Sequence, residues 1–345
     1  MSLINEIREQ PEVLKKQLKK EKSNVLDIAK EIKKYNPEIV HLIARGTSDH
    51  AGIYGQYLFG IQNKIPFSLA CPSLATFYGG IPHFTKSLTI GISQSGMSPD
   101  LIAVIDDCKK QGSPSLVITN TPKSPLGEMA DYVIDCVAGP EKATAATKSY
   151  TTSLMGLAML SAALKDDSKM FEELEKVPEW VAEALKLEDQ AEDVSKYYAY
   201  VQRSVVLGRG YNYATAKEWG LKIQELTYTM AEAYSSADFQ HGPIAMVENR
   251  FPVFAAAFEG KVLDSMLPQL TTISTQLKGN LCSITNSDKV AALSTNTFRI
   301  SKDIPEWLTP FVGIIPAQLF AYHLCISKGQ NTETPRTIAK VTETH

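Results

Sequence analysis

The sequence predicts an α/β fold of two tandem, doubly wound parallel sheets, each a flavodoxin-like three-layer αβα domain. Two observations lead to this prediction: short apolar runs alternate with helix-like segments, and the whole series occurs twice. Continuous apolar runs fit strands that are covered on both faces, and helices between them indicate parallel βα units. With 345 residues, the chain is long enough for two domains with sizeable cores.

Residues 1–36 are expected to form two surface helices ahead of the first sheet. Their apolar side chains recur at helical spacing between Lys and Glu, which is typical of amphipathic helices. These side chains are Ile4, Ile7, Leu14, Leu18, Val25, Ile28 and Ile32.

The expected strands are the short apolar runs of the two copies. In the first copy they cover residues 39–44, 88–92, 116–118 and 132–137, and in the second copy 205–207, 253–258, 281–284 and 297–300. Between the copies, the helical periodicity of residues 151–164, 170–187 and 189–200 predicts connecting helices.

Matches in the same order along both copies indicate an internal duplication. Arg45-Gly46 matches Arg209-Gly210 and Gly96 matches Gly260, both at an offset of 164, while Ile-Thr-Asn recurs at 118–120 and 284–286. We therefore expect N-terminal helices over residues 1–36, one domain over 37–190, a second over 191–330, and a C-terminal active-site tail over 331–345.

Charge and hydropathy argue against nucleic-acid and membrane proteins. The 35 Lys and Arg residues are balanced by 38 Asp and Glu, a net charge of -3, so the basic footprint of a nucleic-acid binder is missing from the composition. The apolar stretch 311–319 is interrupted by Gly and Pro and is shorter than the roughly 20 residues of a membrane span.

The N-terminus and the cysteines predict a cytoplasmic protein. Residues 1–10 alternate charged and apolar residues without the hydrophobic region of an export signal. The cysteines are odd in number and widely spaced, so we expect them to be reduced core residues. They are Cys71, Cys108, Cys136, Cys282 and Cys325.

A serine-rich loop, Ser93-Gln94-Ser95-Gly96-Met97-Ser98, follows the expected strand 88–92 and precedes an amphipathic helix. Its hydroxyls and amide lie at a helix N-terminus, where free backbone N–H groups and the helix dipole favour an anion such as phosphate. The loop has no Lys and no dinucleotide-binding or P-loop pattern, which favours a small phosphate monoester. The alternative is a serine-rich helix cap.

Other polar residues follow neighbouring strands of the same expected sheet. Thr47 and Ser48 follow strand 39–44, and Ala145-Ala146-Thr147-Lys148 follows the last strand of the first copy. Each motif alone is explained equally well as a cap or as a ligand-binding turn. Together they favour a ligand site, because the carboxyl ends of parallel strands lie at one edge of a sheet.

In the second copy, a helix expected over residues 213–228 places Glu218, Lys222 and Glu225 on one stripe. This stripe is either part of a functional site or a solvated helix face with a Glu–Lys pair worth about 0.3 kcal/mol. His241 precedes a helix that is expected to begin at Pro243. It is either a site residue or a residue that packs against or caps this helix. The neighbouring apolar stripe is expected to contain Trp219, Ile223, Leu226 and Met230.

Several strings in order carry a resemblance to a known family. From about residue 37, the chain resembles the tandem sugar isomerase (SIS) domains and is similar to the isomerase half of glucosamine-6-phosphate synthase. Its loops at 44–51 and 95–101 look closer to the stand-alone SIS glucosamine-6-phosphate deaminases. The strings are Gly-Ile-Ser-Gln-Ser-Gly (91–96), Gly-Pro-Glu (139–141), Ala-Thr-Lys-Ser-Tyr-Thr-Thr (146–152), Ala-Glu-Ala-Tyr (231–234) and His-Gly-Pro (241–243).

The resemblance implies roles for individual residues. Glu225 becomes the acid/base that moves a proton between C1 and C2, His241 the ring-opening residue, and Lys340 the residue near the carbonyl carbon. Lys222 joins this catalytic group. The residues implied to bind the sugar phosphate or to support the site are Ser93, Gln94, Ser95, Ser98, Ser48, Thr47, Ala145 and Glu218.

The reaction implied is deamination and isomerisation of glucosamine 6-phosphate to fructose 6-phosphate and ammonia, without a metal or other cofactor. Since Met1-Ser2 leads directly into helices where the synthase has a glutaminase domain, we expect that glutamine is not the ammonia source. The resemblance also implies a homodimer with shared active sites. Alternatives are a fructosamine-6-phosphate deglycase, a galactosamine-6-phosphate deaminase and, outside the enzymes, a sugar-phosphate-binding regulatory protein.

Overall fold

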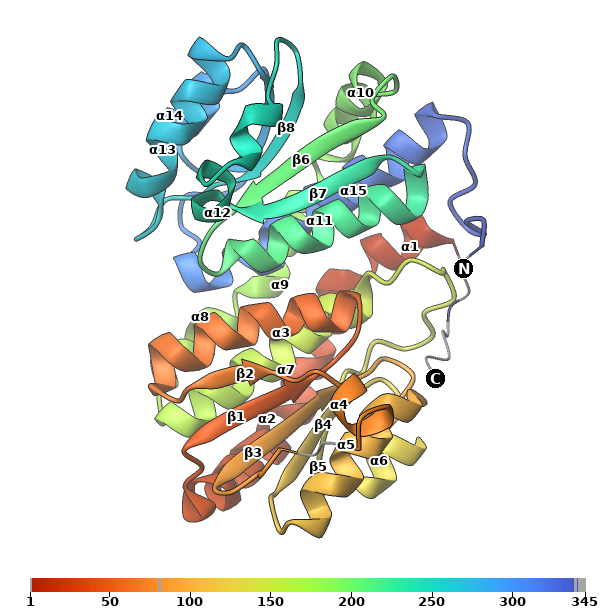
Figure 1. The fold of residues 1–345 in the computed structure, drawn as a ribbon, viewed down its shortest axis with the longest axis vertical. Helices are drawn as coiled ribbons and strands as arrows, with labels where there is room; N and C mark the ends of the chain where they lie inside the picture. The colour runs from red at the N-terminus through yellow and green to blue at the C-terminus, as the bar shows by residue number, and fades with distance from the viewer. Residues whose placement is uncertain (1, 80–81, 338–339, 341–345) are drawn as a thin grey trace. The chain divides into compact units, whose positions relative to one another are not determined.

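Figure 1 shows a computed structural model that describes residues 2–79, 82–337 and 340. The chain divides into two compact units, each with its own five-stranded sheet. The first-sheet unit contains Glu9–Glu141, Ala146–Pro178 and Lys340, and the second-sheet unit contains the N-terminal residues up to Arg8, Lys142–Ala145 and Glu179–Thr337. All strand pairs in both sheets are parallel, as the sequence predicts.

The first sheet has the strand order β2-β1-β3-β4-β5 (Figure 1). Strands β3 and β4 are buried along their whole length, which explains their uninterrupted apolar sequence. The strands are β1 (Ile39–Ile43), β2 (Phe67–Leu69), β3 (Ser87–Ile92), β4 (Ser115–Thr119) and β5 (Tyr132–Asp135). The helices of this unit are α2 (Gln10–Tyr35), α3 (Thr47–Leu58), η1 (Phe59–Asn63), α4 (Ser73–Thr76), α5 (Pro99–Lys110), α6 (Pro125–Met129), α7 (Lys148–Lys165) and α8 (Ser168–Leu174).

Helices cover both faces of the first sheet. On one face, Val104 and Ile105 of α5 pack with Val117 of β4 in a buried cluster. On the other, Gly156 of α7 lies against Ile118 of β4 closely enough that an added Cβ would be 3.2 Å from it. Helices α2 and α3 pack against α7, which completes the three-layer αβα arrangement.

The second sheet has the order β10-β9-β8-β6-β7, which is the same topology as the first. Its strands are β6 (Arg203–Gly208), β7 (Met230–Ser235), β8 (Pro252–Ala256), β9 (Asn280–Thr285) and β10 (Asn296–Arg299). The accompanying helices are α1 (Leu3–Arg8), α10 (Glu188–Tyr197), α11 (Asn212–Thr227), α12 (Ser236–Gln240), η2 (Pro243–Met246), α13 (Leu263–Thr271), η3 (Thr272–Gln276), α14 (Asp288–Leu293), η4 (Glu306–Leu308) and α15 (Thr309–Ser327). Helix α9 (Val177–Leu185) lies where the two units meet in sequence.

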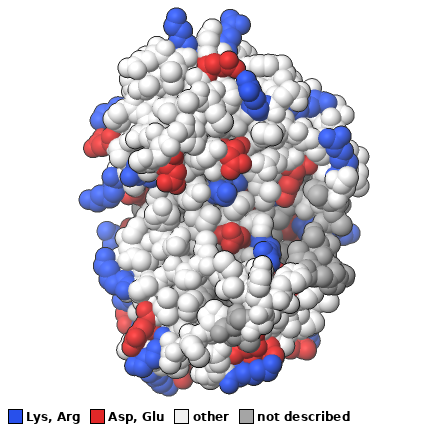
Figure 2. Space-filling view, viewed as in Figure 1, with Lys and Arg blue, Asp and Glu red and all other residues white. Residues whose placement is uncertain are grey.

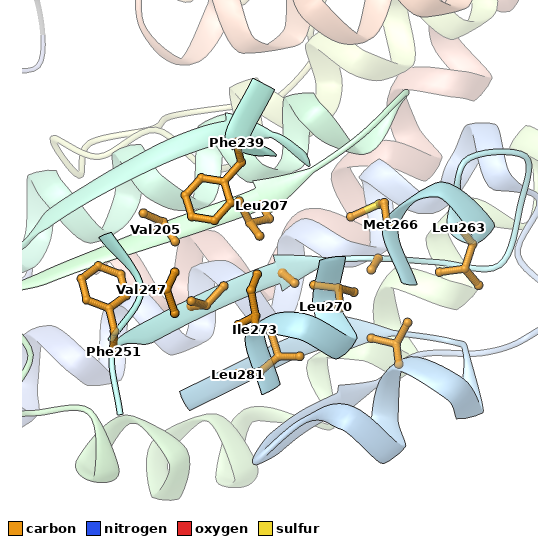
Figure 3. Packing of buried hydrophobic residues seen from close by; sticks show 14 residues of the cluster. Val205, Leu207, Phe239, Val247, Phe251, Leu263, Met266, Leu270, Ile273 and Leu281 are labelled. Carbon is orange, nitrogen blue, oxygen red and sulfur yellow. The ribbon is translucent and has the colours of Figure 1, made fainter. Parts of the chain in front are cut away.

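The core of the second-sheet unit has an aliphatic face and an aromatic face. Figure 3 shows the first of these faces, where Leu270 and Ile273 lie over Leu281 of β9 in a mainly aliphatic cluster that also contains Phe239 and Phe251. On the opposite face, the ring centroids of Phe254 and Phe320 are 5.2 Å apart, and Trp219 is 5.1 Å from Phe254. Side chains of β8 therefore alternate between two buried layers, as expected for a central strand.

Within the described residues, one helix, Glu306–Ser327, is long and apolar enough to cross a membrane by length and composition. Of its most apolar window, 89% is buried inside the structure, which is typical of a core helix. Helix α15 continues through Gly313 and Pro316, so the helix is longer than the apolar stretch 311–319 recognised in the sequence.

Every strand expected from the sequence is present, but two strands and one helix break were missed. β2 and β7 were not predicted, and the helix expected over 170–187 is two helices, α8 and α9. Met230 does not belong to the apolar stripe of α11. Tyr228 ends that helix in the left-handed conformation with φ 55°, and Met230 begins β7 with 69% of its surface exposed.

The duplication predicted from the sequence is confirmed by equivalent turns. Gly46 after β1 and Gly210 after β6 have φ values of 54° and 60°, a conformation that favours glycine. The turn after β8, however, is filled by a side chain of the same unit. Glu306 Oε2 accepts a hydrogen bond from the backbone N–H of Lys261 at 3.0 Å, and a Cβ at Gly260 would lie 2.2 Å from the Glu306 carboxyl carbon.

The cysteines are free, and all except Cys71 are buried. The expectation of a core position is wrong for Cys71, which is exposed in the loop after β2. Burial raises the pKa of the Cys108 and Cys325 thiols to about 11, so these thiols are protonated at neutral pH.

On the face shown in Figure 2, Lys and Arg are interspersed with Asp and Glu.

Candidate active site

The serine-rich loop lies at the carboxyl end of β3, between the strand and α5. Ser93 N–H donates to the carbonyl of Ile118 at 3.1 Å, so the loop starts as a continuation of the sheet. Ser93 Oγ accepts from the N–H of Gly96 at 3.1 Å, and Ser95 Oγ accepts from the N–H of Met97 at 3.3 Å. The loop therefore has a defined tight turn.

Gly96 is required at the centre of this turn. Its φ is +65°, and an added Cβ would lie 1.9 Å from Ser124 Oγ of the neighbouring turn after β4. A side chain at this position would displace Ser124, whose hydroxyl caps α6 through the N–H of Gly127. The turn thus depends on a residue without a Cβ.

Ser98 is the N-cap residue of α5, but its side chain makes no capping hydrogen bond. The helix-cap alternative is therefore wrong for the Ser98 hydroxyl. The first N–H groups of this 12-residue helix and the helix dipole provide favourable electrostatics for an anion next to Ser98.

The loop lines a cavity of about 350 Å³ within the first-sheet unit. Among the residues that the structure describes, Thr47 is half-buried outside the lining, and Ala145 is fully buried and belongs to the second-sheet unit. A larger hollow of about 830 Å³ lies beside Arg203 and Pro252, at the amino ends of β6 and β8, which is the edge opposite to that used by ligands of doubly wound sheets. The 350 Å³ cavity is lined by Arg45, Gly46, Ser48, Ile92, Ser93, Gln94, Ser95, Ser98, Leu101 and Lys340.

Lys340 reaches this cavity and is held by a buried carboxylate. Its Nζ lies 2.9 Å from Glu141 Oε2, and the Glu141 side chain is fully buried. Glu141 also accepts hydrogen bonds from the N–H groups of Thr147 and Ser149, both at 3.0 Å, and from Ser149 Oγ at 2.7 Å. Burial alone would raise the pKa of Glu141, but the Lys340 charge and these donors lower it below its ordinary value.

In the second-sheet unit, the predicted stripe on α11 is a buried charge cluster. Lys222 Nζ lies 2.6 Å from Glu225 Oε2 and 3.3 Å from Glu218 Oε1. The side chains of Lys222 and Glu218 are 1% and 0% exposed, and that of Glu225 is 23% exposed. The solvated-face alternative is therefore wrong.

The carboxylates of this cluster favour the protonated, positively charged form of Lys222. Burial by itself would lower the pKa of Lys222, but the carboxylates of Glu218 and Glu225 more than offset this effect and raise it. Lys222 is consequently a buried cation that holds Glu225 at the partly open end of the cluster.

His241 is exposed at the end of α12, and its backbone N–H donates to the carbonyl of Asp238 at 3.0 Å. Gly242 has φ 137°, and Pro243 begins the short helix η2. The Pro-initiated helix expected after His241 is confirmed as a single 3₁₀ turn.

Two residues near the cavity were missed as site residues. Glu141 stands in the Gly-Pro-Glu string, and Arg45 lies in the turn after β1, where Nε donates to Asp100 Oδ2 at 2.7 Å. The signal for Arg45 was its position one residue before Gly46 of the repeated Arg-Gly pair. The sequence gives no indication of its partner, which lies 55 residues away.

Comparison with known proteins identifies the family. The family model for the SIS domain matches residues 35–163 and 198–328. The chain belongs to the SIS domain family. Relatives include glutamine–fructose-6-phosphate aminotransferases (isomerizing) from Pyrococcus horikoshii, 33% identical over 343 residues, and Thermococcus kodakarensis, 32% identical over 348 residues. The SIS chain is 98% covered in both cases and spans 57% of the length of each relative.

Solved structures confirm the tandem SIS fold. The C-terminal domain of glucosamine-fructose-6-phosphate aminotransferase from Francisella tularensis is 30% identical with a TM-score of 0.89, covering 96% of this chain and 98% of that one. Glucosamine-6-phosphate deaminase from Thermotoga maritima has a TM-score of 0.79 at 22% identity and covers both chains completely, which shows a shared fold. Whole-chain identity is thus higher to these aminotransferases than to this deaminase.

Proposed function

We propose that this SIS chain is an amino-sugar-phosphate isomerase that converts glucosamine 6-phosphate to fructose 6-phosphate and ammonia. The observation that carries the proposal is that Ser93, Ser95 and Ser98 line the same cavity as Lys340. Hydroxyls at a helix N-terminus suit a phosphate, and an ammonium group suits the carbonyl oxygen of an opened sugar. Relatives named for sugar-phosphate isomerisation support this chemistry.

The roles follow the chemistry of an aldose-to-ketose conversion. His241 assists ring opening, and Glu225 takes the proton from C2 and returns it to C1 through an enolamine. The C2 imine that results adds water and releases ammonia, so atoms and charge balance without an oxidant or reductant. Lys222 holds the Glu225 carboxylate, while Lys340 lies near the carbonyl carbon.

A coupled assay tests the proposal on a panel of substrates. Purified protein is supplied with glucosamine 6-phosphate, galactosamine 6-phosphate and a fructosamine 6-phosphate, and ammonia, fructose 6-phosphate and glucose 6-phosphate are measured. Ammonia and fructose 6-phosphate from glucosamine 6-phosphate are expected. Glucose 6-phosphate from the fructosamine adduct would identify a deglycase, turnover of the galacto sugar alone would identify its deaminase, and tight binding without turnover would identify a regulatory protein.

We also propose that the protein acts as a homodimer in which His241 serves the site of the neighbouring subunit. The exposure of the His241 side chain agrees with such a role. Two-fold pairing makes both shared sites equivalent.

A cytoplasmic location is proposed as well, because free cysteines such as the exposed Cys71 are typical of reducing compartments.

Subunit exchange between two inactive variants is expected to restore activity. Glu225→Gln and His241→Ala each disable every site alone, but a mixed dimer has one site with both lesions and one with neither. With random pairing at equal concentration, activity should recover to roughly one quarter of wild type. Activity is measured before and after exchange, so the freshly mixed sample is the control. No recovery, with exchange verified by mass spectrometry, would contradict the shared site.

A further inference from the structure

Arg45 lies in the serine-lined cavity with a guanidinium group that is held from one side only. Its side chain is 51% exposed, and Nε donates to Asp100 Oδ2 at 2.7 Å. Among the residues that the structure describes, Asp100 is the hydrogen-bond partner of this side chain. The two terminal nitrogens of the guanidinium group therefore remain available to a ligand.

Asp100 is placed to orient Arg45. Its side chain is 2% exposed in the first turn of α5, and its Oδ1 accepts the N–H of Leu101 at 2.9 Å. A buried carboxylate fixed through both oxygens restricts the rotation of the guanidinium group that it binds. Such outer contacts orient ligand-binding groups in many sites.

The charge of the cavity points to a role for this orientation. The serine hydroxyls and backbone N–H groups carry no formal charge, whereas a phosphate monoester carries about −1.5 to −2 at neutral pH. Among the described residues that line the cavity, the cations are Arg45 and Lys340, and Lys340 is paired with Glu141. Arg45 uses only Nε for its carboxylate, so it can present two parallel N–H donors to two phosphate oxygens.

We propose that Arg45, oriented by Asp100, binds the phosphate of the substrate and makes the cavity selective for a dianionic ester. This inference rests on the proposed function only in assigning the phosphate to a sugar. The alternative is that the pair simply ties the turn after β1 to α5. The two differ in what they predict for inorganic phosphate, which needs no turnover to bind.

Calorimetric titration separates these roles. Wild type, Arg45→Met, Arg45→Lys and Asp100→Asn are titrated with inorganic phosphate and with glucitol 6-phosphate, which has no carbonyl to react. The matched control is Arg209→Met, because Arg209 occupies the equivalent position in the second copy. Arg45→Met should weaken both ligands roughly 10- to 100-fold, the range expected for a charge-assisted hydrogen bond. Arg45→Lys should recover part of the loss, and Asp100→Asn should weaken binding less than Arg45→Met does.

The outcomes distinguish this inference from the proposed function. Unchanged phosphate affinity in Arg45→Met, or an equal loss in Arg209→Met, would overturn the role of Arg45 whatever the enzyme turns over. A tenfold or larger loss confined to Arg45 variants would support it even if glucosamine 6-phosphate is not a substrate. Far-UV circular dichroism and the melting temperature of each variant verify folding. Since Arg45 is half exposed, Arg45→Met is expected to melt close to wild type.

Discussion

Glu225→Gln should lower the turnover of glucosamine 6-phosphate about 10²- to 10⁴-fold, the usual contribution of a positioned general acid/base. Lys222 binds Oε2 of Glu225 at 2.6 Å, and the Glu225 side chain is 23% exposed, so it is accessible enough to exchange a proton. Glutamine preserves the size and hydrogen bonding of the side chain but cannot act as the base. Substrate binding should therefore change much less than turnover.

Exchange of the C2 proton with deuterated solvent measures this step directly. The proposed transfer through Glu225 would let the C2 proton exchange with solvent deuterium in wild type, and in Glu225→Gln this exchange should fall in parallel with turnover. Glu183→Gln is the matched control, since Glu183 is exposed on α9 and has no proposed role. Wild-type exchange in Glu225→Gln would exclude Glu225 as the proton carrier.

Lys222→Met should destabilise the protein by about 3–5 kcal/mol, because it removes one partner of the buried ion pair between Lys222 and Glu218. The methionine has a similar length and no charge, so the loss comes mainly from the missing positive charge beside the buried carboxylate. The double variant Glu218→Gln/Lys222→Met removes both charges and should recover most of this free energy of unfolding.

Urea denaturation followed by tryptophan fluorescence, to which Trp219 on the same helix contributes, measures these changes. Lys217→Met on α11 is the control for loss of a lysine at a half-buried position. A loss below about 1 kcal/mol in Lys222→Met, or no recovery in the double variant, would show that the cluster is solvated in solution.

The sheets could be predicted because their central strands are buried on both faces. β3 and β9 have no exposed residue, so they appear in the sequence as continuous apolar runs. The missed strands, β2 and β7, lie at the edges of the two sheets and are only partly buried. β2 has three half-buried residues, and β7 begins with exposed Met230, so neither produces such a run.

The site could be predicted in part for a similar reason. The serine-rich loop is contiguous in sequence, and Glu218, Lys222 and Glu225 are related by helical spacing, so local patterns identify both groups. The functional role of the helical stripe followed only from the family resemblance. The partners of Lys340 and Arg45 could not be predicted, because Glu141 is 199 residues from Lys340 and Asp100 is 55 residues from Arg45. Such pairs depend on how loops of separate βα units come together.

The carboxylate of Glu306 in the turn after β8 gives the two copies different capacities. In the first copy, the equivalent turn around Gly96 is open to a cavity lined by hydroxyls. In the second copy, Glu306 already takes the N–H of Lys261, so an arriving phosphate would lose a donor and meet a negative charge. The carboxylate of Glu306 thus occupies, in the second copy, the place that the first copy leaves open to an anion. Duplication of the fold therefore need not duplicate a binding site, and we expect a stoichiometry of one sugar phosphate for each chain.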